Sequence, residues 1–82
     1  MSDLIGTYWM KESHLGFIRV IRVDGPSGYG DFKTTAVQQF KSGRIITEND
    51  YTVTGNQLDS PRWVKIPERE FRKFAVLAEL RK

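Results

Sequence analysis

Short apolar runs rich in β-branched and aromatic residues, separated by polar and glycine-containing stretches, make up the first two thirds of the chain. The clearest run, Phe17 to Val23 (FIRVIRV), lies between Gly16 and Asp24-Gly25 and is too short for a stable helix. It therefore predicts a strand. Alternate residues of a strand point to opposite faces, and each face of this one mixes apolar side chains with arginine, as expected of a central strand. The pattern leaves open which face is buried.

Further strands are predicted wherever a similar short run is bounded by turn residues. These strands are residues 6–10, 34–40, 44–47, 51–54 and 63–66. A tight turn at Ser42-Gly43 makes residues 34–47 a hairpin. Residues 24–33 (DGPSGYGDFK) hold three glycines and a proline and predict a mobile loop, and residues 55–61 form a second turn cluster. Residues 51–54 are alternatively interpreted as part of an extended insertion.

The C-terminal segment allows two structures, and the choice between them decides the fold. Pro67 is well placed as the first residue of a helix, so a helical turn is predicted to begin there. If the helix continued to the end, Val76 and Leu80 would lie on the same side as Arg69 and Lys73 and would be exposed to water. The pattern therefore favours a single helical turn followed by a closing strand at residues 76–80.

The length and composition indicate one folded domain spanning residues 1–82, held together by packing alone because the chain has no cysteine. A cytoplasmic location is expected from the absence of cysteine, of a signal peptide and of an apolar stretch of membrane-spanning length. The net charge is +3, and it is distributed unevenly. Residues 62–82 carry seven basic and three acidic side chains, whereas the other 61 residues carry six basic and seven acidic ones. The C-terminal segment is therefore the basic part of the chain.

The order of short motifs along the chain resembles that of small Src-homology-3-like barrels of the KOW or Tudor type, many of them from phages and mobile elements. The motifs are Gly6, Tyr8 and Trp9; Val20 and Ile21; Val37 and Phe40; Trp63 and Val64; and Pro67 to Phe71. The resemblance implies a mainly β fold, a barrel of five to seven strands with a short helical turn before the last strand. The segment of residues 41–60 is longer than the corresponding part of a compact barrel of this type.

A second resemblance concerns the C-terminal segment alone. Residues 64–74 (VKIPEREFRKF) are similar to the strand-to-helix junction of transcription coactivators of the positive-cofactor-four type. That family implies a curved four-stranded antiparallel sheet followed by a C-terminal helix, with dimers that grip single-stranded DNA. This alternative needs a helix through Leu80, against the helical-wheel pattern, and it ranks second.

The basic segment predicts a nucleic-acid interface, because Lys and Arg neutralise phosphates and a nearby aromatic ring can stack on an unpaired base. The candidate residues are Arg62, Trp63, Lys65, Arg69, Arg72, Lys73 and Tyr51, with Trp63 or Tyr51 as the stacking ring. The competing interpretation is a solvated turn whose charges pair with Glu68 and Glu70. The expected partner is DNA or RNA, and no contact with a membrane is expected. The protein is expected to be a monomer or a small homo-oligomer.

The alternative function is a protein-interaction module, such as a phage or plasmid accessory factor that inhibits or redirects a host protein. Its contact residues would be Tyr29 and Phe32 in the glycine-rich loop, because exposed aromatic residues contribute strongly to binding, together with the basic turn that follows Pro67. No catalytic, cofactor or metal motif is recognised: the glycines do not match a phosphate-binding loop, and the single histidine, His14, lacks a nucleophile by local motif. A non-enzymatic protein without a cofactor is therefore expected.

Overall fold

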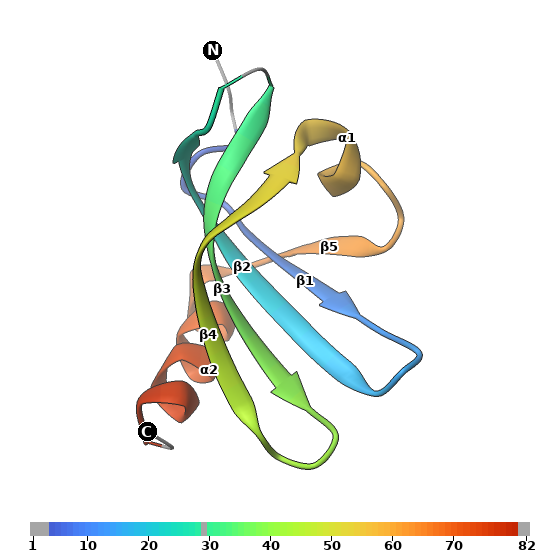
Figure 1. Ribbon diagram of the computed structural model, residues 1–82, viewed down its shortest axis with the longest axis vertical. Helices are drawn as coiled ribbons and strands as arrows, with labels where there is room; N and C mark the ends of the chain where they lie inside the picture. The colour runs from blue at the N-terminus through green and yellow to red at the C-terminus, as the bar shows by residue number, and fades with distance from the viewer. Residues whose placement is uncertain (1–3, 29, 81–82) are drawn as a thin grey trace.

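The computed structural model describes residues 4–28 and 30–80, which form one antiparallel sheet and two helices. The elements in chain order are β1 (Tyr8–Glu12), β2 (Phe17–Pro26), β3 (Asp31–Phe40), β4 (Ile45–Thr54), α1 (Gly55–Leu58), β5 (Trp63–Ile66) and α2 (Glu68–Leu80). The five strands lie in the order β4-β3-β2-β1-β5, so β5 returns across the molecule to pair with β1 (Figure 1). The predicted mainly β class is confirmed, but the described strands form an open sheet rather than a closed barrel.

The predicted closing strand at residues 76–80 is wrong, because these residues belong to α2. Phe71, Phe74 and Ala78 recur at helical spacing and pack against the sheet, and Phe71 and Ala78 are only 5% and 7% exposed. The Phe71 ring lies 5.2 Å, centre to centre, from the ring of Tyr8 on β1. This burial stabilises the helix even though Val76 on its outer side stays exposed. The helix of the second resemblance is therefore present, but it follows five strands rather than four.

The helical turn predicted to begin at Pro67 is the first turn of α2, and a second, unpredicted helix, α1, lies in the turn cluster at residues 55–61. Thr54 caps α1: its Oγ1 accepts a hydrogen bond from the Gln57 amide at 3.1 Å, and Gln57 Oε1 accepts one from the Thr54 amide at 2.8 Å. This reciprocal pair satisfies two amides at the start of the helix. Leu58 then enters the core with 1% of its surface exposed, so α1 is anchored at both ends.

Strand pairing extends the strands beyond the sequence-based boundaries. β2 reaches Pro26 and β3 begins at Asp31, so most of the predicted loop at residues 24–33 is a paired ribbon. β4 is continuous from Ile45 to Thr54, and the predicted interruption at residues 48–50 is absent because this stretch pairs with β3 around a bulge. Neighbouring strands supply the backbone hydrogen bonds that the local sequence pattern could not indicate.

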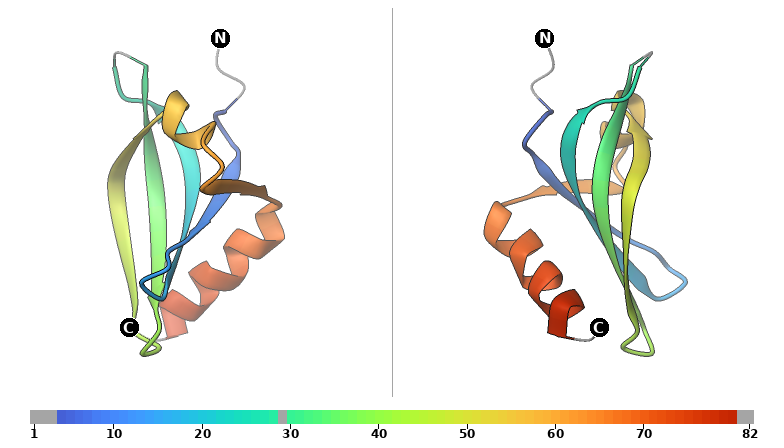
Figure 2. Two further views of the ribbon diagram at one scale, coloured as in Figure 1. Left: turned by 90° about the vertical axis from the view of Figure 1, so that its right-hand side faces the viewer. Right: turned by 60° about the vertical axis from the view of Figure 1, so that its left-hand side comes forward.

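Both faces of the sheet are buried in part, which answers the question that the β2 pattern left open. Ile21 and Val23 lie on the face that α1 covers, here called the α1 face. Val20 lies on the opposite side, the α2 face, where Val37 and Phe71 complete a second apolar cluster. Figure 2 shows α2 along one side of the sheet, at the end opposite to α1. The central strand β2 therefore contributes apolar side chains to a core cluster on each side of the sheet.

Two irregularities in strand pairing bend the sheet around the α1 face. The register shifts between Val23 and Gly25 on β2, and again on β4 opposite Thr35. Bulges of this kind bend and twist a strand. The helix α1 contacts both edge strands, β4 and β5, and so closes one end of the α1 face. Among the described elements, no helix covers the other end, where Phe17 and Phe40 lie.

Candidate nucleic-acid interface

A row of side chains crosses all five strands on the α1 face. Successive pairs in the strand register bring the row's members side by side, because directly paired residues project from the same face. From β5 to β4 the row consists of Trp63, Lys11, Arg19, Gln38 and Ile46. The Lys11 Nζ lies 5.8 Å from the centre of the Trp63 ring, close enough for a cation–π contact. Two cationic residues are thus paired across β1 and β2, with the charge of Lys11 directed toward β5.

Arg19 is held in a defined position by contacts to two other strands. Its Nε donates a hydrogen bond to Gln38 Oε1 at 2.8 Å, and a second guanidinium nitrogen donates to the same oxygen. The guanidinium carbon lies 4.4 Å from the centre of the Tyr51 ring. Because Gln38 is buried and Arg19 half-buried, this positive charge has little freedom to move away from the face. It is a fixed cation rather than a solvated surface arginine.

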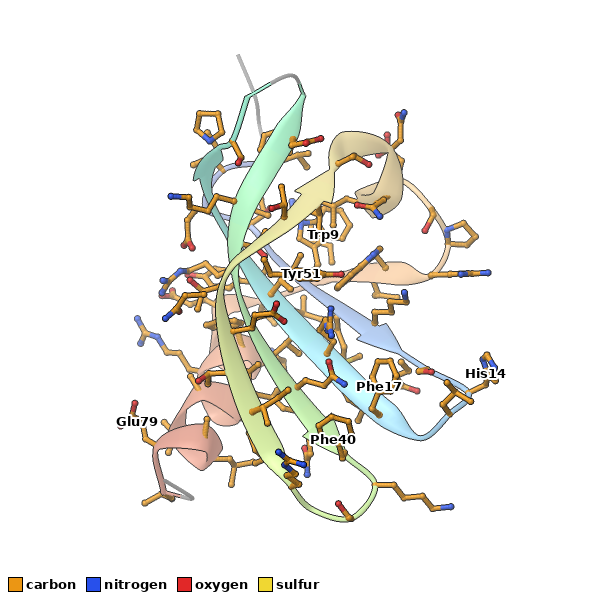
Figure 3. The ribbon with its side chains drawn as sticks, viewed as in Figure 1. Trp9, His14, Phe17, Phe40, Tyr51 and Glu79 are labelled. Carbon is orange, nitrogen blue, oxygen red and sulfur yellow. The ribbon has the colours of Figure 1, made fainter. Side chains whose placement is uncertain are left out.

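An aromatic pair marks the uncovered end of the α1 face. Phe17 on β2 and Phe40 on β3 are paired in register, and their ring centres are 6.4 Å apart with the planes inclined by 57°. Figure 3 shows the two rings next to each other in front of the sheet, below Tyr51. Both side chains are half-buried. They offer an apolar surface on the same face of the sheet as Arg19.

Two adjoining hollows lie at the edge of the α1 face and share two cationic side chains, Lys11 and Arg62. The first has a volume of about 350 Å³, and its other lining residues are Asn56, Gln57, Ser60 and Trp63. The second has a volume of about 330 Å³, and its other lining residues are Glu12, Ser13, His14 and Phe17. Each hollow therefore combines an aromatic side chain with hydrogen-bonding groups and with the shared pair of positive charges.

Four of the predicted nucleic-acid-binding residues belong to this side of the molecule. Arg62 lines both hollows. Lys65 is exposed and pairs across the strands with Trp9, and Tyr51 contacts Arg19. Trp63 is 8% exposed, so most of its ring is packed against the core. Trp63 therefore forms the floor of a hollow rather than a free platform.

The other three predicted residues lie on α2, on the opposite side of the sheet. Arg72 forms an ion pair with Glu68 at 2.7 Å, and Lys73 forms one with Glu70 at 3.2 Å. Arg69 is exposed on the same helix. The structure thus separates these cations from Arg62 and Lys65, and it supports the solvated interpretation for Arg72 and Lys73.

Two aromatic residues were predicted to contact a protein, and the structure describes one of them. Tyr29 lies outside the described residues. Phe32 lies in β3 rather than in a loop, where it is paired with Val53 and packs half-buried against the core of the α1 face.

Several residues of the α1 face were absent from the sequence-based site. They are Lys11, His14, Phe17, Arg19, Gln38, Phe40, Asn56, Gln57 and Ser60. The alternation in FIRVIRV places Phe17 and Arg19 on the same face of a strand, so these two residues could have been grouped from the sequence. The cross-strand register that brings Lys11 beside Arg19 has no local sequence signature.

Comparison with protein-family models, with curated proteins and with solved structures found no match for this chain. No helix in the described part of the chain is long and apolar enough to cross a membrane. Residues 4–28 and 30–80 also contain no group of three or more His, Asp or Glu side chains that could hold a metal ion. The function is therefore inferred from the chemistry of the site residues themselves.

Proposed function

We propose that this chain is a non-enzymatic binding domain whose α1 face holds a single strand of DNA or RNA. The observation that carries the proposal is the pair of hollows that share Lys11 and Arg62, one floored by Trp63 and the other bordered by Phe17. Non-specific single-strand binding needs a cationic groove along the backbone and apolar or aromatic surfaces for the bases. Here a phosphate between the two cations would direct its neighbouring nucleotides into the two hollows.

A single strand fits this surface better than a duplex does. The aromatic side chains are recessed in the face, so a base must be unstacked before it can reach Trp63 or the ring of Phe17. Bases in a duplex present only their edges in the grooves. The side chains of Asn56, Gln57 and Ser60 on the wall of the first hollow can hydrogen bond to the edge of an unpaired base.

The fold that we propose for this function is a partly closed barrel of the Src-homology-3-like kind in a cytoplasmic protein. Two features support the barrel: β5 pairs with β1, and α1 bridges β4 and β5 over the buried Leu58. The bulges in β2 and β4 also favour a curved rather than a flat sheet. The absence of cysteine supports the proposed cytoplasmic location, because cytoplasmic proteins rarely depend on disulfides.

Fluorescence anisotropy with labelled oligonucleotides tests the proposal. Single-stranded DNA, single-stranded RNA and a duplex of the same sequence are titrated with the protein at low and moderate salt. Phosphate contacts by Lys11, Arg62 and Lys65 predict that single-strand affinity falls about twentyfold between roughly 50 and 200 mM salt, and a fourth contact by Arg19 would raise this to about fiftyfold. The duplex is expected to bind more weakly at both concentrations. No binding of any of the three at the lower salt concentration would contradict the proposal.

A further inference from the structure

The outer side of α2 carries exposed apolar residues among its cations. Val76, Leu77 and Leu80 are 56%, 39% and 76% exposed, respectively. A shallow groove of about 540 Å³ runs along this side, lined by Arg69, Arg72, Lys73, Val76 and Leu77. Apolar surface is thus continuous with three positive charges on one helix, and this surface is here called the outer α2 surface.

The fold does not need these apolar side chains. Phe71, Phe74 and Ala78 already pack α2 against the sheet, and the outer residues lie on the opposite side of the helix. Leaving Val76 and Leu80 in water gains nothing for folding, and an exposed apolar patch with a polar rim is characteristic of an interaction surface. The outer α2 surface therefore has the composition of a docking site.

Charge restricts the occupant. All three rim residues are cations: Arg72 and Lys73 form exposed ion pairs with Glu68 and Glu70, which are weak, and Arg69 has no ion-pair partner among the described residues. A second copy of the chain would place the same cations against them. A partner with both apolar side chains and carboxylates complements the exposed apolar residues and the cationic rim.

We infer that the outer α2 surface binds an acidic amphipathic helix of another protein. The apolar side chains of that helix would pack on Val76, Leu77 and Leu80, and its carboxylates would face Arg69, Arg72 and Lys73. The surface lies on the opposite side of the sheet from the proposed nucleic-acid site, so both partners can be bound together. It also gives the protein-interaction function a site that does not depend on Tyr29 or Phe32.

A designed peptide tests this inference. The probe is a fluorescein-labelled helical peptide with leucines on one face and glutamates on the flanks, and its control is a scrambled peptide of the same composition. The double variants Val76→Asp/Leu80→Asp and Arg69→Glu/Lys73→Glu are expected to weaken peptide binding at least about tenfold. Lys41→Glu/Arg44→Glu, in the exposed turn between β3 and β4, reverses the same number of charges as a control and is expected to change the affinity less than about twofold. Circular dichroism checks that each variant is folded.

Other results of this experiment would overturn the inference. The scrambled peptide could bind as tightly as the designed one, which would mean that charge alone is recognised. Sedimentation could show a dimer that Val76→Asp/Leu80→Asp dissociates, which would assign the surface to a second copy. Binding to phosphatidylserine vesicles that the same variant abolishes would assign it to a membrane. Finally, the peptide could leave the amide resonances of α2 unchanged. Lys11→Glu/Arg62→Glu should leave peptide binding intact, so this test is independent of the nucleic-acid proposal.

Discussion

The guanidinium carbon of Arg19 lies 4.4 Å from the centre of the Tyr51 ring, which links β2 to β4 across the α1 face. Gln38 on β3 holds the same guanidinium through a hydrogen bond of 2.8 Å from Nε. The side of the Tyr51 ring that faces Arg19 is therefore covered, and a base could stack there only by displacing the arginine. Arg19 is better placed to attract a phosphate than Tyr51 is to stack on a base.

Arg19→Met separates the charge of this residue from its packing. Methionine retains an apolar side chain over the Tyr51 ring but removes the positive charge, so the fold should be kept. If Arg19 contacts one phosphate, the slope of log affinity against log salt for single-stranded DNA should become shallower by about 0.7. Anisotropy titrations at four salt concentrations measure the slope. An unchanged slope in a folded variant would exclude Arg19 from the path of the strand.

The packing of α2 predicts opposite results for two apolar residues on one helix. Phe71 is 5% exposed, and Phe71→Ala should lower the free energy of unfolding by about 3–4 kcal/mol. Val76 is 56% exposed, and Val76→Ala should change it by less than about 0.5 kcal/mol. Urea denaturation measures both. A large loss for Val76→Ala would mean that Val76 is buried in solution, as the closing strand predicted from the sequence would require.

The cap of α1 predicts a graded loss of stability. Thr54→Ala removes the Oγ1 that accepts from the Gln57 amide, and it should destabilise the protein by about 1 kcal/mol. Leu58→Ala, at 1% exposure, should cost about 3 kcal/mol because it leaves a cavity over the α1-face core. Asn56→Ala is the control, since Asn56 is exposed on the same helix and should have little effect on unfolding. Equal stability of all three variants would show that α1 does not anchor the sheet.

The sequence predicted elements whose signals are local. The strand Trp63–Ile66 and the helix start after Pro67 were both correct, because a proline restricts its neighbours wherever it stands. The helix end was wrong for a physical reason. The exposure of Val76 and Leu80 was counted against a long helix, whereas the gain from burying Phe71 on the sheet was not visible in the sequence. Tertiary packing decided the outcome.

The candidate site was predictable only where its residues are contiguous. Arg62, Trp63 and Lys65 could be found because they follow one another on the way into β5. Lys11 and Arg19 are brought beside them by strand register, which depends on the pairing of β1 with both β2 and β5. The charges on α2 were grouped with Arg62 because they are near it in sequence, although the sheet separates them.

The most direct test of the central claim compares two charge reversals of equal size in single-strand binding. Lys11→Glu/Arg62→Glu reverses the cations shared by the two hollows, and Arg72→Glu/Lys73→Glu reverses the same number of charges on α2. Anisotropy with labelled single-stranded DNA at low salt should show at least about a thirtyfold loss for the first pair and less than about threefold for the second. Equal losses for both pairs would mean that the affinity for single-stranded DNA depends only on the total charge of the protein. A larger loss for the α2 pair would move the nucleic-acid site to the helix and contradict the account.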